Sequence, residues 1–276
     1  MVVAAVLLAA LLHASWNAIA HSVTDRLVGF ALLGLAETAC ALVALAFVPA
    51  PARPSWPFLV AAASLHIGYT LLLMLTYHIG EFGQVYPLAR GISPLLVALV
   101  ATFVVGEALP LPHAVGILVI SLGLLSLVFA GGRPRGDQRL AIAAAVATGV
   151  LIAGYTVVDG VGVRHSGTAL GYTTWLFLLQ GPVLPIVALV ARRRRLVEDA
   201  RGVWTPGLVA GVLSVGAYGL VLWAQTVGTL ATVAALRESS IVFGAIFATV
   251  FFKEPFGRAR IVASAAVVAG IVLLTF

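Results

Sequence analysis

The sequence predicts an all-α integral membrane protein with ten transmembrane helices, arranged as two inverted five-helix repeats. Three observations lead to this fold class. The 276-residue chain is 62% hydrophobic and 9% charged, with a mean hydropathy of +1.12, and has too few solvating side chains for a water-soluble domain of this size. Its apolar runs approach the roughly 20 residues that cross a hydrocarbon core about 30 Å thick. The two halves of the chain also share a repeated sequence.

The repeat is clearest around two arginines. Val85 to Glu107 aligns without a gap on Thr232 to Glu254, at an offset of 147 residues. Arg90 therefore corresponds to Arg237, and the glutamates that end the two segments correspond to each other. A self-similar sequence of this kind has to be recognised before the fold is argued, because it decides the architecture.

A second match defines the extent of the repeat. Residues 14–17 resemble residues 153–156 at an offset of 139, and the difference between the two offsets (147 − 139 = 8) gives the second half about eight extra residues. The simplest place for them is the basic loop at 192–201. We therefore expect a first five-helix repeat over residues 1–132 and a second, inverted five-helix repeat over residues 139–276.

Ten apolar runs, separated by charged residues, Pro and Gly, predict the spans. In chain order they cover residues 2–20, 27–48, 57–78, 84–105, 111–130, 139–158, 168–191, 204–226, 229–251 and 257–275. An odd number of crossings in each repeat means that the second repeat enters the membrane from the opposite face. Functional sites in such folds lie near the membrane midplane, between the repeats.

Local features shape several of these helices. The first run lacks a basic start and a small-residue cleavage site, which predicts a retained helix and not a signal peptide. Pro87 and Pro94 flank Arg90 in the fourth run and predict a kinked or locally unwound helix. The ninth run lacks these prolines, so the two halves are expected to differ in function. Small residues that favour close helix contact are Gly116, Gly123, Gly207 and Gly211.

Basic residues predict the orientation. Twelve Lys or Arg residues lie in the loops after odd-numbered spans, and two lie in the loops after even-numbered spans. The first group comprises Arg26, Arg133, Arg135, Arg139, Arg192, Arg193, Arg194, Arg195, Arg201, Lys253, Arg258 and Arg260, and the second comprises Arg53 and Arg164. Because short cytoplasmic loops retain positive charge, we expect a multi-pass protein of the cell membrane with both termini outside the cytoplasm.

The bulk charge and the metal-binding residue types exclude other classes. The net charge of +6 does not indicate nucleic-acid binding, because it lies in membrane-flanking loops, where the run 192–195 is expected to contact anionic membrane lipids. A single cysteine, Cys40, excludes an internal disulfide. The histidines form no i, i+4 pair and no cluster with Cys or Asp, so we expect no metal, haem or other cofactor. Within the spans, His13 and His66 are expected to bond to neighbours or to line a pathway.

Four ionisable residues lie deep in the predicted spans, where a charged side chain is costly unless it is paired or has a functional role. They are Glu37, Arg90, Arg237 and Glu238. By the inverted repeat, Arg90 and Arg237 enter from opposite faces and are expected to reach one central cavity. Their planar guanidinium groups suit a carboxylate or phosphoryl group. The alternative is that either arginine pairs with Glu37 or Glu238 and only fixes helix packing, since buried charges are normally paired.

Glu37 and Glu238 are also candidate proton carriers. Burial favours a neutral carboxyl group and a nearby arginine favours the carboxylate, so that protonation depends on what occupies the site. The alternative for each is a permanently ionised partner of an arginine, and it applies most to Glu238, which adjoins Arg237 in sequence.

Deep aromatic residues are candidate cavity walls, although ordinary helix packing also explains any one of them. They are Trp16, Tyr69, Tyr155, Tyr172, Trp175, Tyr218 and Trp223. Five of them complete the predicted binding site with the four charged residues, namely Trp16, Tyr69, Tyr155, Trp175 and Tyr218. Glu107 and Glu254 end the fourth and ninth spans and are expected to bond backbone groups at the start of the next helix.

Three stretches resemble EamA-type members of the drug/metabolite transporter superfamily. They are HASWN at 13–17, VYPLARGISPLLVAL at 85–99 followed by Gly106-Glu107, and ALRESSIVFGAIF at 235–247 followed by Lys253-Glu254. The resemblance spans essentially the whole chain and implies a secondary transporter of small metabolites, often an exporter of amino acids or similar solutes, with a cavity between the repeats. Two departures are His21, where the family often has Lys, and the lack of a second-repeat proline matching Pro94, which argues against symmetric gating.

We therefore expect a secondary active transporter with alternating access, and not an enzyme. The expected substrate is a small anionic or zwitterionic metabolite, either amino-acid-like or an organic acid, with proton coupling left open by the buried carboxyl groups. The alternative is an intramembrane enzyme acting on lipid-linked substrates, which would need Asp-rich metal motifs, whereas the four Asp residues lie apart in the sequence. A third alternative is a non-catalytic assembly factor or a channel. A passive channel is expected to show a ring of repeated polar residues along one helix, and this sequence has none.

Overall fold

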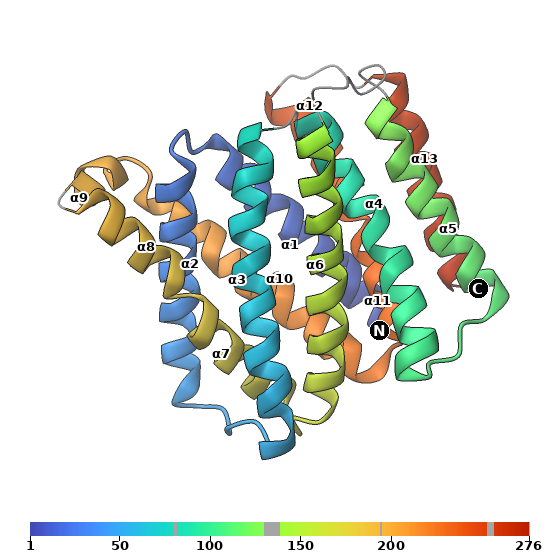
Figure 1. The fold of residues 1–276 in the computed structure, drawn as a ribbon, viewed down its shortest axis with the longest axis horizontal. Coiled ribbons are helices and arrows are strands. Elements are labelled where there is room, and N and C mark those ends of the chain that lie inside the picture. The colour runs from blue at the N-terminus through green and yellow to red at the C-terminus, as the bar shows by residue number, and fades with distance from the viewer. Residues whose placement is uncertain (80–81, 130–138, 194, 253–256, 276) are drawn as a thin grey trace.

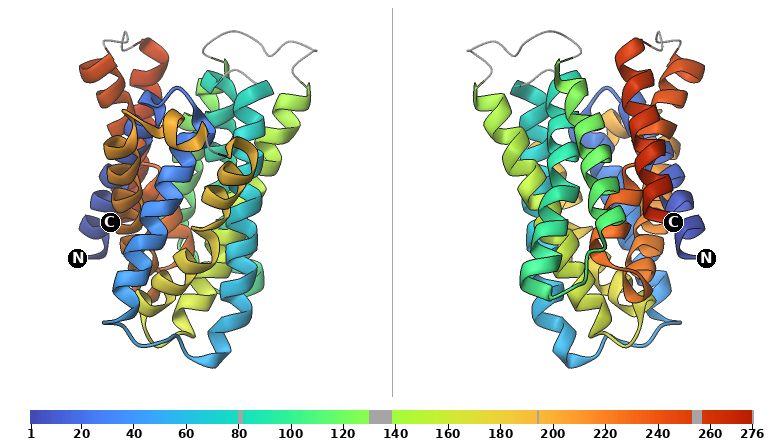
Figure 2. Two further views of the ribbon diagram at one scale, coloured as in Figure 1. Left: turned by 90° about the vertical axis from the view of Figure 1, so that its left-hand side faces the viewer. Right: turned by 90° about the vertical axis from the view of Figure 1, so that its right-hand side faces the viewer.

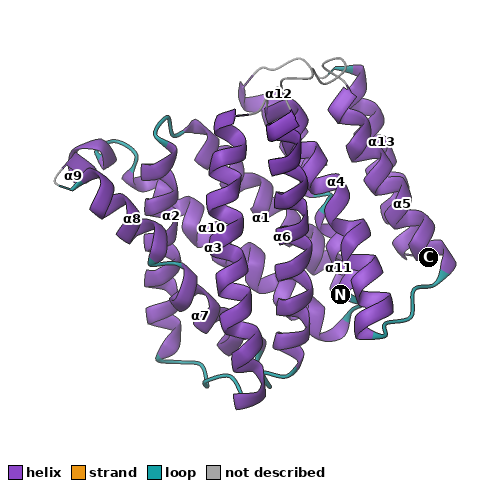
Figure 3. Cartoon of the chain, viewed as in Figure 1, coloured by secondary structure: helices purple, strands orange, loops and turns teal. Residues whose placement is uncertain are grey.

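The computed structural model describes residues 1–79, 82–129, 139–193, 195–252 and 257–275. These residues form helices and connecting loops without any strand (Figure 3). Within them, ten spans are long and apolar enough to cross a membrane. The predicted class, an all-helical ten-span membrane protein, is confirmed. Lys253 and Glu254 lie outside the described residues, as do Arg133 and Arg135 of the loop between the two halves.

The first half contains five spans. They are α1 (Val2–Ser22), α2 (Arg26–Leu45), α3 (Trp56–Ile79) with the short turn η1 (Arg53–Ser55) before it, α4 (Phe82–Val100) continued by the π-helical turn η2 (Ala101–Val105), and α5 (Leu111–Ser126) continued by η3 (Leu127–Phe129). The carboxylate of Asp25 caps α2 by accepting the backbone N–H of Val28. Gly106 ends the fourth span with a φ of 82°, a left-handed conformation that glycine adopts without strain.

The second half also contains five spans, two of which are each made of two helices. Its elements are α6 (Arg139–Arg164), α7 (Ala169–Gln180), α8 (Val183–Arg192), α9 (Arg195–Ala200), α10 (Trp204–Val227), α11 (Leu230–Arg237), α12 (Ser240–Phe252) and α13 (Arg258–Thr275). The seventh span is α7 with α8, and the ninth is α11 with α12. The short helix α9 occupies the basic loop in which the extra residues of the second half were expected.

The described helix breaks lie in the seventh and ninth spans and not in the fourth span, where the sequence predicted one. Of the kink or local unwinding expected in the fourth span, the unwinding is wrong, because α4 continues through Pro87 and Pro94, and the kink stays a prediction. The ninth span is broken by a local tightening of the backbone. The N–H groups of Glu238 and Ser239 donate to carbonyls only three residues back, and the Ser239 hydroxyl donates to the carbonyl of Leu236. Arg237 therefore ends α11 beside a break in its span.

The strongest helix contacts correspond when the two halves are exchanged. The helices concerned are labelled in Figure 1. Helix α1 packs against α10, as α6 packs against α3. Helix α6 packs against α4, as α1 packs against α11 and α12, while α5 pairs with α13 and α2 pairs with α7 and α8. The views in Figure 2 show the α5–α13 pair on one side of the bundle. This pattern is consistent with the predicted inverted repeat of five spans each.

Close helix contacts fall where glycines predicted them. Gly207 and Gly211 of α10 face α2, where an added Cβ would overlap the Leu32 and Ala36 side chains. Gly116 and Gly123 of α5 face α13 in the same way. Small residues let helix backbones approach closely, and packing of this kind drives helix association in a membrane, where burial of apolar surface contributes little.

Candidate functional site

A cavity of about 120 Å³ lies between the two halves of the bundle. Its walls come from α1, α2 and α3 of the first half and from α6, α7, α8, α10 and α11 of the second. Four of the predicted aromatic residues line it, namely Trp16, Tyr69, Tyr155 and Tyr218. The fifth, Trp175, does not line it, and instead packs edge-on against Trp56 with ring centroids 4.9 Å apart. Trp175 thus contributes to helix packing in this conformation.

Arg237 lies in the cavity wall at the end of α11, beside the break in the ninth span. It is 8% exposed, and its guanidinium carbon lies 5.6 Å from the centre of the Tyr218 ring, within the range of a cation–π contact. Among the described residues, no carboxylate lies within ion-pair distance of it. A buried guanidinium held only by an aromatic face retains donors for an anionic group in the cavity.

Glu37 lies in the same cavity, near the middle of α2, and is 7% exposed. Its carboxyl group accepts a hydrogen bond of 2.8 Å from the Ser214 hydroxyl of α10. It pairs with neither Arg90 nor Arg237. The side-chain carbonyl oxygen of Gln180, also in the cavity wall, has no hydrogen-bond donor within the described part of the chain. The cavity therefore combines one cationic group with at least two acceptor groups.

Arg90 and Glu238 form an ion pair between the two halves. The distance from Arg90 Nε to Glu238 Oε2 is 2.9 Å, and both side chains are 4% exposed. Arg90 also donates to the Ser240 hydroxyl at 3.1 Å. Neither residue belongs to the cavity wall. Of the pairings that the sequence left open, the fold selects the one between α4 and the broken ninth span, which places the two charges in helix packing in this conformation.

A buried carboxylate that sequence reasoning did not select, Asp159 of α6, lies directly behind the cavity wall. It is fully buried, and it accepts hydrogen bonds from three side chains on three other helices. Tyr172 of α7 donates at 3.1 Å, Tyr218 of α10 donates through a short bond, and His66 Nε2 of α3 lies 2.8 Å away. His66 and Tyr218 also line the cavity. We call these four residues the Asp159 cluster.

Aromatic stacking fixes the imidazole in the Asp159 cluster. The ring of Tyr155 stacks on His66 with centroids 3.9 Å apart and an angle of 23° between the planes. Tyr218 meets the same imidazole edge-on, with its hydroxyl 3.2 Å from Nε2. The expectation that His66 bonds to neighbouring groups is confirmed, and its side chain also lines the cavity. The imidazole therefore connects the cavity with the buried carboxylate.

The sequence did not indicate Asp159 as a buried charge, because the predicted sixth span ended at residue 158. The helix α6 extends to Arg164, which leaves Asp159 five residues inside it. The run Val161-Gly162-Val163, without any charge, was the signal for this longer helix. Its three partners lie 13, 59 and 93 residues away in sequence, so that no local motif could identify the cluster.

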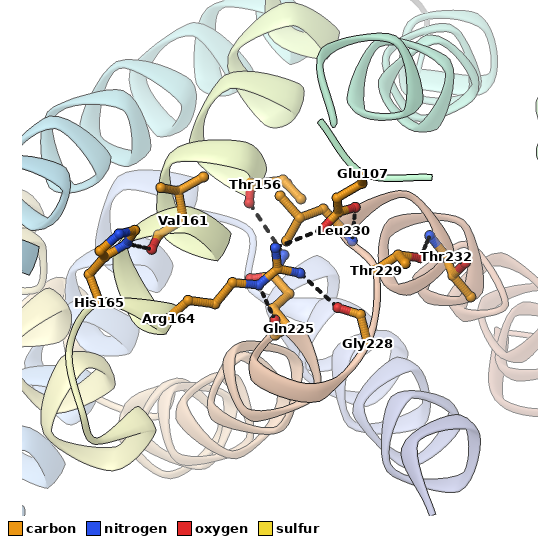
Figure 4. A network of polar contacts seen from close by, with 10 residues as sticks. All are labelled: Glu107, Thr156, Val161, Arg164, His165, Gln225, Gly228, Thr229, Leu230 and Thr232. Atoms are coloured by element: carbon orange, nitrogen blue, oxygen red, sulfur yellow. Dashed lines mark hydrogen bonds and ion pairs between the residues drawn. The ribbon is translucent and has the colours of Figure 1, made fainter. Parts of the chain in front are cut away.

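A second polar network lies at the end of the bundle that carries the loops after the even-numbered spans, which we call the even-loop end (Figure 4). Arg164 pairs with Glu107 at 2.6 Å and donates to the backbone carbonyls of Gln225 and Gly228, both at 2.8 Å. The other carboxylate oxygen of Glu107 accepts the N–H of Leu230 at 2.8 Å. Glu107 does bond the start of a helix, but that helix is α11 of the other half and not the next helix α5, because the fold brings these two ends together.

The Asp159 cluster and the Arg164–Glu107 network both lie between the cavity and the even-loop end of the bundle. Asp159 lies between the cavity wall and Arg164, which is the last residue of α6. Beyond Asp159, the Arg164–Glu107 network joins the end of the fourth span to the connection between α10 and α11 (Figure 4). Two successive polar layers thus lie between the cavity and the even-loop end, whereas the cavity wall extends along α2 toward Phe30, near the odd-loop end.

Ten candidate membrane spans around a cavity with one buried guanidinium define a multi-pass membrane protein with an internal cavity. The family model described as the EamA-like transporter family matches residues 139–276, which is the second half of the chain. The chain belongs to the EamA-like transporter family.

The other comparisons concern the fold. A solved crystal structure, titled only as that of a protein, is 20% identical to this chain with a TM-score of 0.76. The similarity covers 98% of this chain and 95% of the other, so the shared fold includes both halves. No curated protein sequence matches this one significantly.

Proposed function

We propose that this protein is a secondary active transporter that binds the carboxylate of a small metabolite on Arg237 and exposes the cavity to each face of the cell membrane in turn. The observation that carries the proposal is the placement of Arg237. A guanidinium that is 8% exposed, lies in the cavity wall and has no carboxylate partner among the described residues is costly in a membrane. An anionic substrate offsets that cost through charge-assisted hydrogen bonds.

The acceptor groups of the cavity favour an amino-acid-like zwitterion over a plain organic acid. Glu37 is bonded by a single hydroxyl, and the Gln180 carbonyl oxygen has no donor within the described residues. Both offer lone pairs to an ammonium group, which carries three donors and no acceptor. The remaining wall is largely aromatic and aliphatic, including Trp16, Tyr69 and Phe177, and suits the apolar part of such a molecule.

Alternating access fits the way the two halves meet. The even-loop end is held by the Arg164–Glu107 network between the halves, and breaking that network would open the cavity on that side. The distribution of basic residues supports an orientation with the odd-numbered loops in the cytoplasm and both termini outside. The closed layer would then face the exterior.

Ligand-induced stabilisation of the purified protein tests the substrate class. We expect one or more of the twenty common amino acids to raise the unfolding temperature, because a ligand bound to the native state alone stabilises it. For the most effective amino acid, the matched acid without the amino group and the matched amine without the carboxylate should stabilise less. The variant Arg237→Gln should lose roughly 10- to 100-fold in affinity, since a charged hydrogen bond contributes about 1.5–3 kcal/mol. Arg53→Gln, an exposed arginine in η1, is the control.

Counterflow in proteoliposomes tests transport itself. Vesicles loaded with the unlabelled amino acid should take up the labelled form transiently and saturably, whereas a channel would show no such overshoot. Recovery of a chemically altered product would favour the intramembrane enzyme instead. Equal binding by the wild type and Arg237→Gln would remove Arg237 from the substrate site.

A further inference from the structure

The Asp159 cluster has an unbalanced charge. Asp159 is fully buried, and two of its three donors, Tyr172 and Tyr218, are neutral hydroxyl groups. The third, His66, is the only partner within ion-pair distance of Asp159 in the described part of the chain, and it balances the charge only when it is protonated. With a neutral imidazole the pair carries a net charge of −1, and with one more proton it is neutral. A buried charge without a partner is costly, so one proton stabilises the pair.

The proton has a route to this pair. The His66 side chain is 11% exposed and lines the cavity, whereas the Asp159 side chain is fully buried behind it. A water molecule in the cavity can therefore exchange a proton with the imidazole but not with the carboxylate directly. Stacking on Tyr155 holds the ring in place while its charge changes.

Few other charges act on Asp159. The elements packed against α6 contribute Tyr69 from α3, Tyr86 and Arg90 from α4, Arg237 from α11 and the exposed Arg53 from η1. Helix α6 itself adds Tyr155 and Arg164. Arg90 is neutralised by Glu238, and Arg164 is neutralised by Glu107. Arg237 is then the buried cation of this set without a carboxylate partner within the described residues, and it reaches Asp159 through Tyr218.

The contacts of Tyr218 with Arg237 and Asp159 couple proton binding at the His66–Asp159 pair to substrate binding at Arg237. In the empty cavity the positive charge of Arg237 helps to stabilise the negative His66–Asp159 pair. An anionic group bound to Arg237 cancels that charge, so that the pair gains more from a proton. By thermodynamic linkage, the proton must strengthen binding of the anionic group by the same factor.

We propose that the His66–Asp159 pair is the proton-binding site of the transporter, which takes up one proton together with the substrate carboxylate bound by Arg237. The inference rests on the proposed function. The proton comes from cavity water and joins the imidazole, the net charge of the pair changes from −1 to 0, and no covalent bond to the substrate forms or breaks. When the Arg164–Glu107 network opens, the pair releases the proton to the even-loop side.

The two carboxyl groups selected from the sequence fit this role less well. Glu238 pairs with Arg90 at 2.9 Å and does not line the cavity, so it has no contact with cavity water. Glu37 has a hydroxyl partner, and no contact within the described residues connects it with Arg237. Glu37 therefore serves as the competing proton carrier in the experiment.

A substrate-free experiment tests the proton site. In protein labelled with ¹³C and ¹⁵N at histidine, the signal missing from His66→Gln belongs to His66. We expect this imidazole to change charge reversibly when the pH is varied, and Asp159→Asn to alter that response. A His66 signal that does not respond to pH, or that responds identically in both proteins, overturns the proposal whether or not a transported molecule is known.

A transport experiment tests the coupling with the amino acid that stabilises the protein most. A pH step that is acid on the substrate side should drive accumulation by up to about tenfold per pH unit for one coupled proton. Asp159→Asn and His66→Gln should lose the accumulation, each compared with its own counterflow, which needs no net proton movement. Because His66→Gln leaves the charge of Asp159 unbalanced, its counterflow should require more substrate than that of Asp159→Asn. The control Thr148→Val should keep both, because it alters a buried hydroxyl contact with Thr76 between the same two helices without changing charge.

Each result bears on a different claim. Absence of counterflow in the wild type rejects the proposed function and leaves the histidine titration as the test of the proton site. Gradient-driven accumulation that persists in both Asp159→Asn and His66→Gln overturns the proton site. Loss of gradient-driven accumulation in Glu37→Gln but in neither of the other two variants assigns coupling to Glu37, and it also overturns the proton site. If Asp159→Asn does not fold, His66→Gln and Asp159→Glu decide, and loss of counterflow in both of these folded variants contradicts the proposal.

Discussion

The guanidinium of Arg237 lies over the ring of Tyr218, at 5.6 Å from its centre, while the hydroxyl of the same ring donates to the buried carboxylate of Asp159. One side chain thus contacts a cation in the cavity wall and an anion behind it. This arrangement joins the site proposed for the substrate to the site proposed for the proton.

The shape of the Arg237 side chain should matter in addition to its charge. In Arg237→Lys the cation is retained, but the planar fork that matches a carboxylate is lost. We expect about a tenfold weaker affinity for the stabilising amino acid, less than the loss in Arg237→Gln. Isothermal titration or thermal-shift titration of the two variants measures this order. A lysine variant that binds as tightly as the wild type would show that charge alone suffices.

The Arg90–Glu238 pair should behave as a buried ion pair in a double-mutant cycle. Removing one partner leaves the other charge buried, so Arg90→Gln or Glu238→Gln should each cost about 3–5 kcal/mol of folding free energy. The double variant should be much less destabilised than the sum of the two, with a coupling of roughly 1–3 kcal/mol. Unfolding in detergent or mixed micelles provides the measurement. Strict additivity would contradict the pairing seen between α4 and the ninth span.

The Arg164–Glu107 network should control access from the even-loop face. In a Cys40→Ser background, Ala217→Cys places a thiol in the cavity wall. We expect Arg164→Gln or Glu107→Gln to accelerate its reaction with a membrane-impermeant thiol reagent added on the even-loop side, because each change removes the ion pair between the halves. Arg53→Gln on the same face is the matched control and should leave the rate unchanged. Equal rates in all variants would show that another contact closes the pathway.

The contact between α10 and α2 should be intolerant of larger side chains. A Cβ at Gly211 would overlap Ala36 and the backbone of Leu33, so Gly211→Val should destabilise the protein by roughly 1–3 kcal/mol or more. Gly216→Val on the same helix meets only the tip of the Leu12 side chain at 3.6 Å, and it should cost much less. Thermal unfolding of the pair measures the difference. Similar stability of both variants would contradict the close helix approach.

The orientation can be tested without a substrate. The twelve basic residues of the odd-numbered loops, against two in the even-numbered loops, predict that both termini lie outside the cytoplasm. A reporter fused after residue 276 should therefore be active only if it functions outside, and a reporter in the 192–201 loop should be active only if it functions inside. Cytoplasmic activity of the C-terminal fusion would invert the assignment of the closed layer to the exterior.

The sequence by itself determined the ten spans and the two halves. Runs of about 20 apolar residues have few alternatives in a membrane, because every backbone polar group in lipid must be satisfied inside a helix. The glycines of the fifth and eighth spans also predicted close contacts that the structure confirms. Four of the five aromatic residues selected for depth do line the cavity, since depth in a span follows directly from position in the run.

Only the tertiary structure decided how the polar groups combine. Arg90 and Arg237 occupy equivalent repeat positions, yet one is ion-paired with Glu238 and the other faces the cavity. The position of the helix break also depended on context, because α4 continues through its prolines while i→i−3 hydrogen bonds interrupt the ninth span. No sequence pattern predicted the Asp159 cluster, because its members come from four helices. Their meeting depends on helix packing over long sequence separations, which hydropathy and local spacing do not encode.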